Sequence, residues 1–203
     1  MTPTPQNLPA RWQQAQLKKA SGIIPFYLTP AEVSRMAAAA AGRHQLRDKL
    51  LILTLFWTAL RVSEAVSLTP AMISYYQGQP FFTVQGKGKK NRLVSCPEPL
   101  IHQLQSFAYS QGLKRDDRFF KITRVRAWQI IKELGERAGI AKEVWPHLFR
   151  HSGAIERLRQ TRNPKSLQIH LGHSSMSMSM RYLTTLSAQD ALEIESQVQY
   201  REE

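Results

Sequence analysis

The sequence predicts a mainly α-helical domain with one small antiparallel β-sheet, an α+β arrangement. Capping signals precede several apolar helical segments, whereas two β-prone runs at 81–84 and 93–96 flank a loop rich in Gly and Lys. The chain has 203 residues, 42% of them hydrophobic, which suits one domain with a core of ordinary size. The longest apolar stretch, LLILTLFWTAL at 50–60, has the length of a buried helix and is too short to span a membrane.

The chain divides into an N-terminal extension at 1–28 and a domain at 29–203. The extension is basic and rich in Pro and Gln, so we expect it to be largely irregular. The first well-defined helix begins after Thr29, which can cap it, while Glu32 completes a capping box. Gly42 is expected to end this helix.

The remaining elements follow from periodicity and turn residues. An apolar helix at 44–60 precedes a bend, and the two β-prone runs then form a hairpin. Ser187 and Asp190 form a further capping box at the start of an acidic C-terminal tail, 187–203. Further helices are expected at 61–68, 98–111, 124–138, 147–160, after Asn163, and at 176–183.

The charge balance indicates a polyanionic partner. The chain has 28 Lys and Arg against 15 Asp and Glu, a net charge of +13. Five of the acids lie in the last 14 residues, so the rest of the chain is more basic still. Nucleic acid is the usual partner of such a basic protein. A basic protein that binds no nucleic acid could have the same composition.

The N-terminus and the cysteine content indicate the cytoplasm. No hydrophobic signal segment opens the chain. Cys96 is the single cysteine, which excludes an internal disulfide and a cysteine-based zinc module.

The stretch WPHLFRHSGAIERLRQ brings two histidines and an arginine into five positions. His147 and His151 are four residues apart on one helical face and could bind zinc, with His170 or His173 as a third ligand. A zinc protease would need Glu at the position of Leu148, so a metal site is disfavoured.

A phosphate-binding site is the alternative interpretation, and it accounts for polar residues in more segments of the chain. His147 and Arg150 share a helical face, and Arg61 follows the apolar helix with Glu64 three residues later to hold it. His173 and Tyr182 follow in the segments LGHSS and MSMSMRYLTT. The hairpin loop GKGKKNR contributes further cations that can reach a DNA groove: Lys87, Lys89, Lys90 and Arg92.

These motifs resemble the tyrosine recombinases, the phage-integrase-like site-specific recombinases, from about Thr29 to Leu186. TALRVSE, GKGKKNRL, PHLFRHS, LGHSS and the later tyrosine occur in that family's order and approximate spacing. The resemblance implies the catalytic-domain fold of these enzymes and strand exchange on double-stranded DNA at a specific site. It implies neither a metal nor a cofactor, because the covalent link to DNA retains the bond energy.

The resemblance also implies roles for six residues and one supporting acid. Tyr182 would attack a backbone phosphate and form a 3′-phosphotyrosine, while two guanidinium groups stabilise the charge on the phosphate oxygens. A lysine would protonate the leaving oxygen. The implied catalytic residues are Arg61, Lys87, His147, Arg150, His173 and Tyr182, supported by Glu64. We assign proton handling to His147, and phosphate binding or support of the site to His173.

Ordinary explanations exist for single residues. Arg61 and Glu64 could form only a salt bridge, Lys89 could be confused with Lys87, and His151 could pack or bind the DNA backbone. Apolar neighbours of Tyr182 could indicate packing. Two other functions share the motif set: a type IB-like topoisomerase and a DNA-binding regulator without catalysis.

The regions before and after the motifs bear on how subunits assemble on DNA. Too few residues precede the first helix for the helical DNA-clamping domain that most relatives carry, so the size resembles the short recombinases of fimbrial inversion, or an excised fragment. The acidic tail is expected to dock on a neighbouring subunit and so to link a homotetramer on DNA. The sequence HSGAIERL departs from the family's commoner small-residue pattern, and nothing in the chain specifies the DNA site or the biological outcome.

Overall fold

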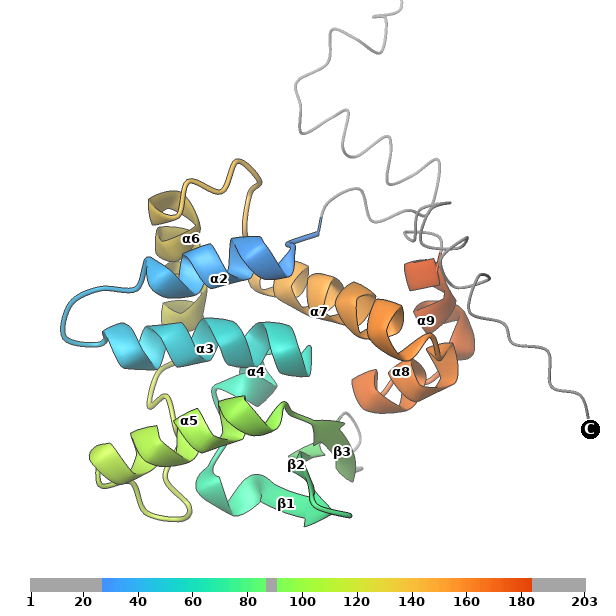
Figure 1. Ribbon diagram of the computed structural model, residues 1–203, viewed down its shortest axis with the longest axis horizontal. Coiled ribbons are helices and arrows are strands. Elements are labelled where there is room, and N and C mark those ends of the chain that lie inside the picture. Colours follow the sequence, from blue (N-terminus) through green and yellow to red (C-terminus); the bar gives the residue numbers. More distant parts are fainter. Residues whose placement is uncertain (1–26, 87–90, 184–203) are drawn as a thin grey trace, which may run out of the picture.

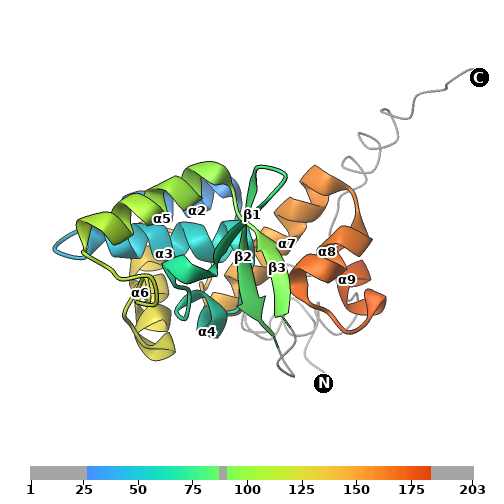
Figure 2. The same cartoon turned by 90° about the horizontal axis from the view of Figure 1, so that it is seen from below.

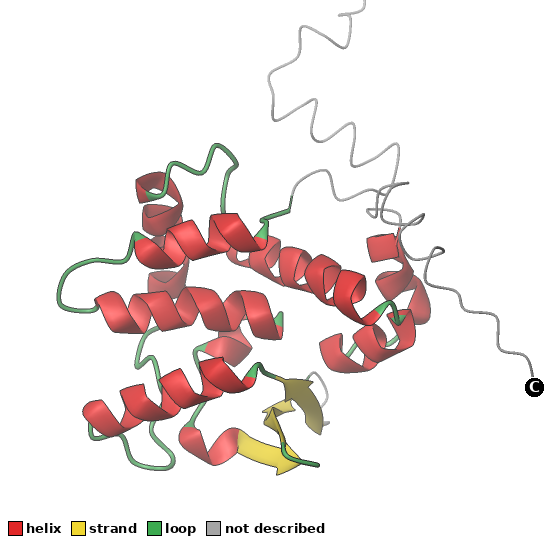
Figure 3. Ribbon diagram, in the orientation of Figure 1, coloured by secondary structure: helices red, strands yellow, loops and turns green. Residues whose placement is uncertain are grey.

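The computed structural model describes residues 27–86 and 91–183 and confirms a helical protein with one small sheet (Figures 1 and 3). Within these ranges no helix is long and apolar enough to cross a bilayer. In chain order the elements are α2 (Pro30–Ala38), α3 (Gln45–Thr58), α4 (Val62–Ala65), the 3-10 helix η2 (Pro70–Met72), β1 (Ile73–Tyr76), β2 (Gln79–Gln85), β3 (Asn91–Ser95), α5 (Glu98–Ser110), α6 (Arg124–Arg137), α7 (Pro146–Thr161), α8 (Pro164–Leu171) and α9 (Met176–Leu183).

Helix α3 is the centre of the domain. It packs against α2, α5 and α7, so other elements cover most of its circumference. Leu51, Ile52 and Leu55 on this helix are fully buried, which explains why its sequence is apolar on nearly all sides from Leu50 onward. Helices α8 and α9 pack on each other and on α7, at the end of the molecule away from α6 (Figures 1 and 2).

The two predicted capping signals within the described residues, at Thr29 and Asn163, act as predicted. Thr29 Oγ1 accepts a hydrogen bond from the Glu32 backbone N–H at 3.2 Å, and Glu32 Oε2 accepts one from the Thr29 N–H at 2.8 Å. Asn163 Oδ1 caps α8 by accepting the Ser166 N–H at 2.9 Å. Helix α2 ends at Ala38, somewhat earlier than the predicted end near Gly42.

The predicted hairpin is the β2–β3 pair of a three-stranded antiparallel sheet. Strand β1 was not predicted; it is a short edge strand with its two tyrosines, Tyr75 and Tyr76, exposed. Gln77 and Gly78 join β1 to β2. Both have positive φ, as a tight two-residue hairpin turn of type I′ requires. Four residues were too few to establish an alternating pattern.

A second, smaller hydrophobic cluster joins the end of α3 to α7, α8 and α9. The buried members are Ala59, Ala154, Ile155, Leu158, Leu167, Leu171 and Tyr182. Tyr27 packs on this cluster, and the Leu28 N–H donates to Ser152 Oγ at 2.7 Å. These two residues, predicted as part of the extension, therefore pack on the domain; the rest of the extension and the acidic tail lie outside the described residues.

Gly153 permits the close contact between α7 and α3. A Cβ atom at this position would overlap the backbone carbonyl oxygen of Phe56, which no side-chain rotation can relieve. We expect Gly153→Ala to lower the free energy of unfolding by ~3 kcal/mol, since overpacking must move a backbone. Thermal denaturation should show a melting temperature lower by roughly 10 °C.

Gly135→Ala is the matched control for this prediction, because Gly135 is also a buried helical glycine, on α6. Its added Cβ would meet side-chain atoms, the nearest being Val144 Cγ2 at 3.0 Å, which can adjust. Equal destabilisation by the two substitutions would contradict the importance of the Phe56 carbonyl.

Candidate active site

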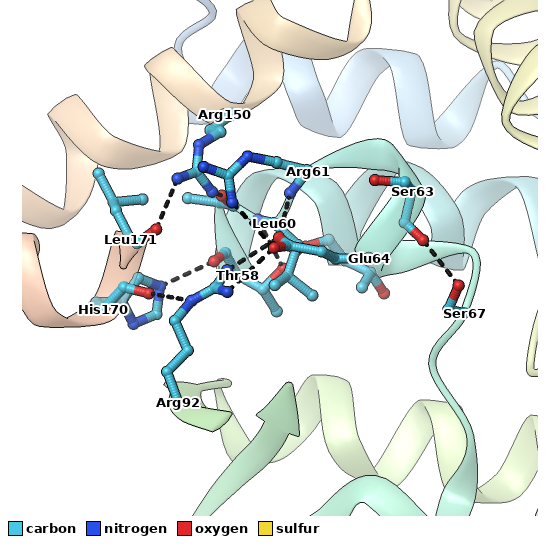
Figure 4. A network of polar contacts seen from close by, with 12 residues as sticks. Thr58, Leu60, Arg61, Ser63, Glu64, Ser67, Arg92, Arg150, His170 and Leu171 are labelled. Atoms are coloured by element: carbon cyan, nitrogen blue, oxygen red, sulfur yellow. Dashed lines mark hydrogen bonds and ion pairs between the residues drawn. The ribbon is translucent and has the colours of Figure 1, made fainter. Parts of the chain in front are cut away.

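Arg150 is buried at the centre of the candidate site, with 4% of its surface exposed. Its Nη1 donates to the carbonyl oxygen of Ala59 at 2.7 Å and its Nη2 to that of Leu171 at 2.8 Å. Ala59 caps α3 in the left-handed conformation, and Leu171 is the last residue of α8. The ends of two helices therefore fix the guanidinium of a third (Figure 4).

Burial lowers the pKa of Arg150 to about 10, and the positive charge of nearby Arg61 acts in the same direction. This value still lies well above neutrality, so Arg150 keeps its charge at physiological pH. One hydrogen on each terminal nitrogen is used by a carbonyl, and the second on each can donate to a bound anion. The arrangement suits an anchored cation that faces a phosphate.

Glu64 holds the other arginine of the motif set. Its Oε2 accepts the Arg61 backbone N–H at 2.9 Å, and its Oε1 accepts Arg61 Nη1 at 3.0 Å. The Arg61 side chain remains 38% exposed, so it is positioned from one side and accessible from the other. Glu64 thus contacts both the backbone and the side chain of Arg61.

Arg92 occupies a different position from the one predicted for it. The sequence assigned it to a DNA groove with the loop lysines, but its side chain is only 10% exposed. Its Nη1 and Nη2 bind the two carboxylate oxygens of Glu64 at 3.0 and 2.9 Å, and its Nε donates to the His170 carbonyl at 3.1 Å (Figure 4). Arg92 is thus a structural link between β3, α4 and α8.

The charge state of Glu64 follows from these contacts. Burial by itself would raise the pKa of this carboxyl group, but the hydrogen bonds from Arg92 and from the Arg61 backbone outweigh burial and lower it. Glu64 is therefore ionised at neutral pH and carries the negative charge between the two guanidinium groups.

Tyr182 lies on α9 with 4% of its surface exposed, and its hydroxyl is 3.1 Å from Nδ1 of His151. Burial raises the pKa of the Tyr182 phenol, an effect that the charge of Arg150 partly opposes. The phenol is consequently protonated at neutral pH and needs a proton acceptor before it can act as a nucleophile.

Of the two other predicted histidines, His173 contacts Tyr182 and His147 neighbours His151. His173 stacks on the Tyr182 ring, with centroids 6.2 Å apart, and its Nδ1 lies 2.9 Å from Ser179 Oγ. Burial and the charge of Arg150 lower the pKa of His173 to about 4, so it is neutral at pH 7. His147 is exposed, and its ring centroid lies 6.2 Å from that of His151.

His170 belongs to the framework of the site. Its Nε2 lies 2.8 Å from the Thr58 carbonyl oxygen, and burial lowers its pKa to about 3. The neutral ring therefore donates its Nε2 hydrogen to the end of α3.

The loop lysines Lys87, Lys89 and Lys90 lie outside the described residues. Strand β3 starts at Asn91, and the next residue, Arg92, is bound to Glu64. The described end of the loop therefore adjoins the arginine network. Within the described ranges, the N-cap position of α4 contributes Arg61 to the site, while α7 and α9 contribute Arg150 and Tyr182. The charges of these groups influence one another.

The fold is that of a tyrosine recombinase catalytic domain. A crystal structure of XerA recombinase has a TM-score of 0.69 and 27% identity, and the match covers 87% of this chain and 66% of the other. The catalytic domain of bacteriophage HP1 integrase, with 24% identity, shares the fold at a TM-score of 0.61 over 84% of this chain and 94% of its own.

The chain belongs to the phage integrase family, whose pattern matches residues 27–189. It is 36% identical over 166 residues to a tyrosine recombinase of Thermosipho africanus, and this alignment covers 79% of the chain and 57% of the relative. It is 33% identical over 168 residues to tyrosine recombinase XerA of Pyrococcus furiosus, covering 78% and 57%. The chain thus spans less than three fifths of the length of these relatives.

Proposed function

We propose that the protein is a site-specific recombinase that cleaves and rejoins double-stranded DNA through a 3′-phosphotyrosine intermediate. The observation that carries this proposal is the buried Tyr182 hydroxyl, 3.1 Å from a histidine of α7 and close to the anchored Arg150. The two relatives described above are tyrosine recombinases, which favours recombination over the topoisomerase alternative.

The two arginines suit the phosphate. In the proposed reaction the Tyr182 oxygen attacks phosphorus and the 5′ oxygen leaves, so negative charge collects on the non-bridging oxygens. Arg150 is rigidly held by two carbonyls and Arg61 by Glu64, so both can stabilise that charge without rearranging. His147 and the neutral His173 are proposed to contact the same phosphate oxygens.

Lys87 is proposed to donate the proton that the 5′ oxygen needs when it leaves. A lysine ammonium beside the scissile phosphate is a suitable general acid. The attachment of Arg92 to Glu64 supports this assignment, because it ties the described end of the hairpin loop to the arginine network. Lys89 and Lys90 are proposed to bind the DNA backbone.

Covalent capture tests the proposal directly. The protein would be mixed with fragmented, nicked DNA from the source organism, so that the short strand beside a cut diffuses away and the adduct accumulates. We expect a denaturation-resistant protein–DNA adduct whose DNA-linked peptide contains Tyr182, and sequencing the trapped fragments gives the site. Salt-sensitive binding without any adduct would support a regulator that binds DNA without catalysis.

We further propose that the acidic tail, 187–203, joins subunits into a tetramer on DNA. The support is its charge, opposite to that of a strongly basic body. Deleting 187–203 is expected to reduce the tetrameric complex on a captured site at least about tenfold while single-subunit binding persists. Analytical ultracentrifugation measures both, and an unchanged tetramer would argue that the tail folds on its own subunit.

A further inference from the structure

We infer that His151, rather than the predicted His147, accepts the proton of the Tyr182 hydroxyl during strand cleavage. This inference rests on the proposed function, since it names the base of that reaction. His151 would be a catalytic residue, because its ring nitrogen contacts the attacking oxygen.

The contact geometry selects His151. Its Nδ1 lies 3.1 Å from the Tyr182 oxygen, within the distance at which a proton can be transferred directly. The two ring centroids are 5.9 Å apart at an angle of 47°. His173, by contrast, stacks on the face of the tyrosine ring at 10° and directs its Nδ1 toward Ser179.

Helix periodicity explains how one helix can serve both the phosphate and the nucleophile. Arg150 and His151 are consecutive on α7, so their side chains diverge by about 100° around the helix axis. Arg150 points toward the ends of α3 and α8, where two carbonyls hold it. His151 points toward Tyr182 on α9.

His147 lies one turn earlier on the same face as His151 and is exposed. Its ring centroid is 6.2 Å from that of His151, so the two imidazoles are neighbours. This position suits contact with an incoming phosphate at the surface, whereas His151 is half-buried beside the tyrosine.

The proton and the bonds balance in the inferred step. The Tyr182 O–H proton moves to His151 Nδ1 as the phenol oxygen forms its bond to phosphorus. The bond from phosphorus to the 5′ oxygen breaks, and that oxygen takes a proton from the acid proposed above. Rejoining reverses each transfer, with His151 returning its proton to the phenol oxygen.

The buried hydroxyl supports the need for such an acceptor. Tyr182 is 4% exposed, so bulk water has little access to its proton. Burial also raises the pKa of this phenol, so at neutral pH it is not already ionised. A base in direct contact is the simplest route for the proton.

The test compares two versions of a nicked DNA carrying the captured site, one with the ordinary 5′ oxygen and one with sulfur at that bridging position. A thiolate leaves without needing a proton, so the sulfur substrate rescues loss of the acid but not loss of the base. We expect His151→Ala to slow single-turnover cleavage about 100-fold on both substrates. Lys87→Ala should be slow on oxygen and restored on sulfur.

His151→Asn distinguishes proton transfer from positioning. Asparagine can hold the Tyr182 hydroxyl by a hydrogen bond but cannot accept its proton, so this variant is expected to remain as slow as His151→Ala. Added imidazole should speed cleavage by His151→Ala. Wild-type rates in the asparagine variant would overturn the inference, as would recovery of His151→Ala on the sulfur substrate.

His147→Ala is the rival variant, expected to lose less activity than His151→Ala. The reverse order, with the sulfur-independent defect at His147, would return the base to His147 and overturn the inference. Failure of the proposed function is separable from this result, because the wild-type protein would then give no adduct at Tyr182 on either substrate. A wild-type adduct with an undiminished rate in His151→Ala refutes only the role of His151.

Discussion

Replacing Tyr182 with phenylalanine is expected to abolish the covalent protein–DNA adduct while leaving the protein folded and able to bind DNA. The substitution removes one oxygen, the proposed nucleophile, and keeps the ring that packs in the smaller cluster. It also removes the hydrogen bond to His151, which should reduce the free energy of unfolding by only about 1 kcal/mol. The adduct is measured by denaturing electrophoresis on nicked DNA, and binding by a mobility shift.

Tyr109→Phe is the matched control, since Tyr109 lies on α5 with 89% of its surface exposed. This variant should form the adduct at the wild-type rate. An adduct that persists in Tyr182→Phe would identify another nucleophile and refute the assignment. Loss of DNA binding in Tyr182→Phe would instead indicate that the phenol supports the fold or the DNA contact.

Local sequence signals predicted most of the helices. The Thr29–Glu32 capping box and the Asn163 cap act within three residues, so their signals are complete in the sequence. The edge strand β1 depends on its antiparallel partner, with Ile73 opposite Phe82. Such pairing between separate segments is weakly encoded in four residues, which explains why this strand was missed.

The polar motifs predicted contacts between residues close in sequence but not contacts between distant ones. Arg61 and Glu64 are three residues apart on a short helix, so their pairing follows from spacing. The sequence places Arg92 in a run of basic residues, and this run alone does not show whether the Arg92 side chain points toward DNA or into the domain. Its partner Glu64 is 28 residues away, and only the fold brings the two together.

The contact of His151 with Tyr182 was not predicted, for a similar reason. Its spacing of four from His147 suggests a metal site, and the sequence also allows His151 to pack or to bind the DNA backbone. The partner that defines its chemistry, Tyr182, is 31 residues away on another helix. The sequence shows only that His151 directly follows Arg150, and the contact with Tyr182 depends on the packing of α9 against α7.

Replacing Arg150 with lysine is expected to slow strand cleavage by about 100- to 1000-fold, the usual effect of removing one donor that stabilises transition-state charge. Lysine keeps the positive charge, but its single ammonium cannot replace the planar guanidinium. In the wild type one planar group bonds both Ala59 and Leu171 carbonyls while its other hydrogens can bind phosphate. Single-turnover cleavage of a nicked DNA carrying the captured site measures the loss.

A measurement of the free energy of unfolding separates the loss of cleavage from unfolding. At least one buried carbonyl loses its partner in Arg150→Lys, so the free energy of unfolding should fall by about 1–3 kcal/mol. The exposed Arg137 on α6 gives the control Arg137→Lys, which should change neither cleavage nor stability. If Arg150→Lys cleaves DNA as fast as the wild type, charge alone suffices at this position, and the two helix-end carbonyls hold Arg150 for the fold rather than for the phosphate.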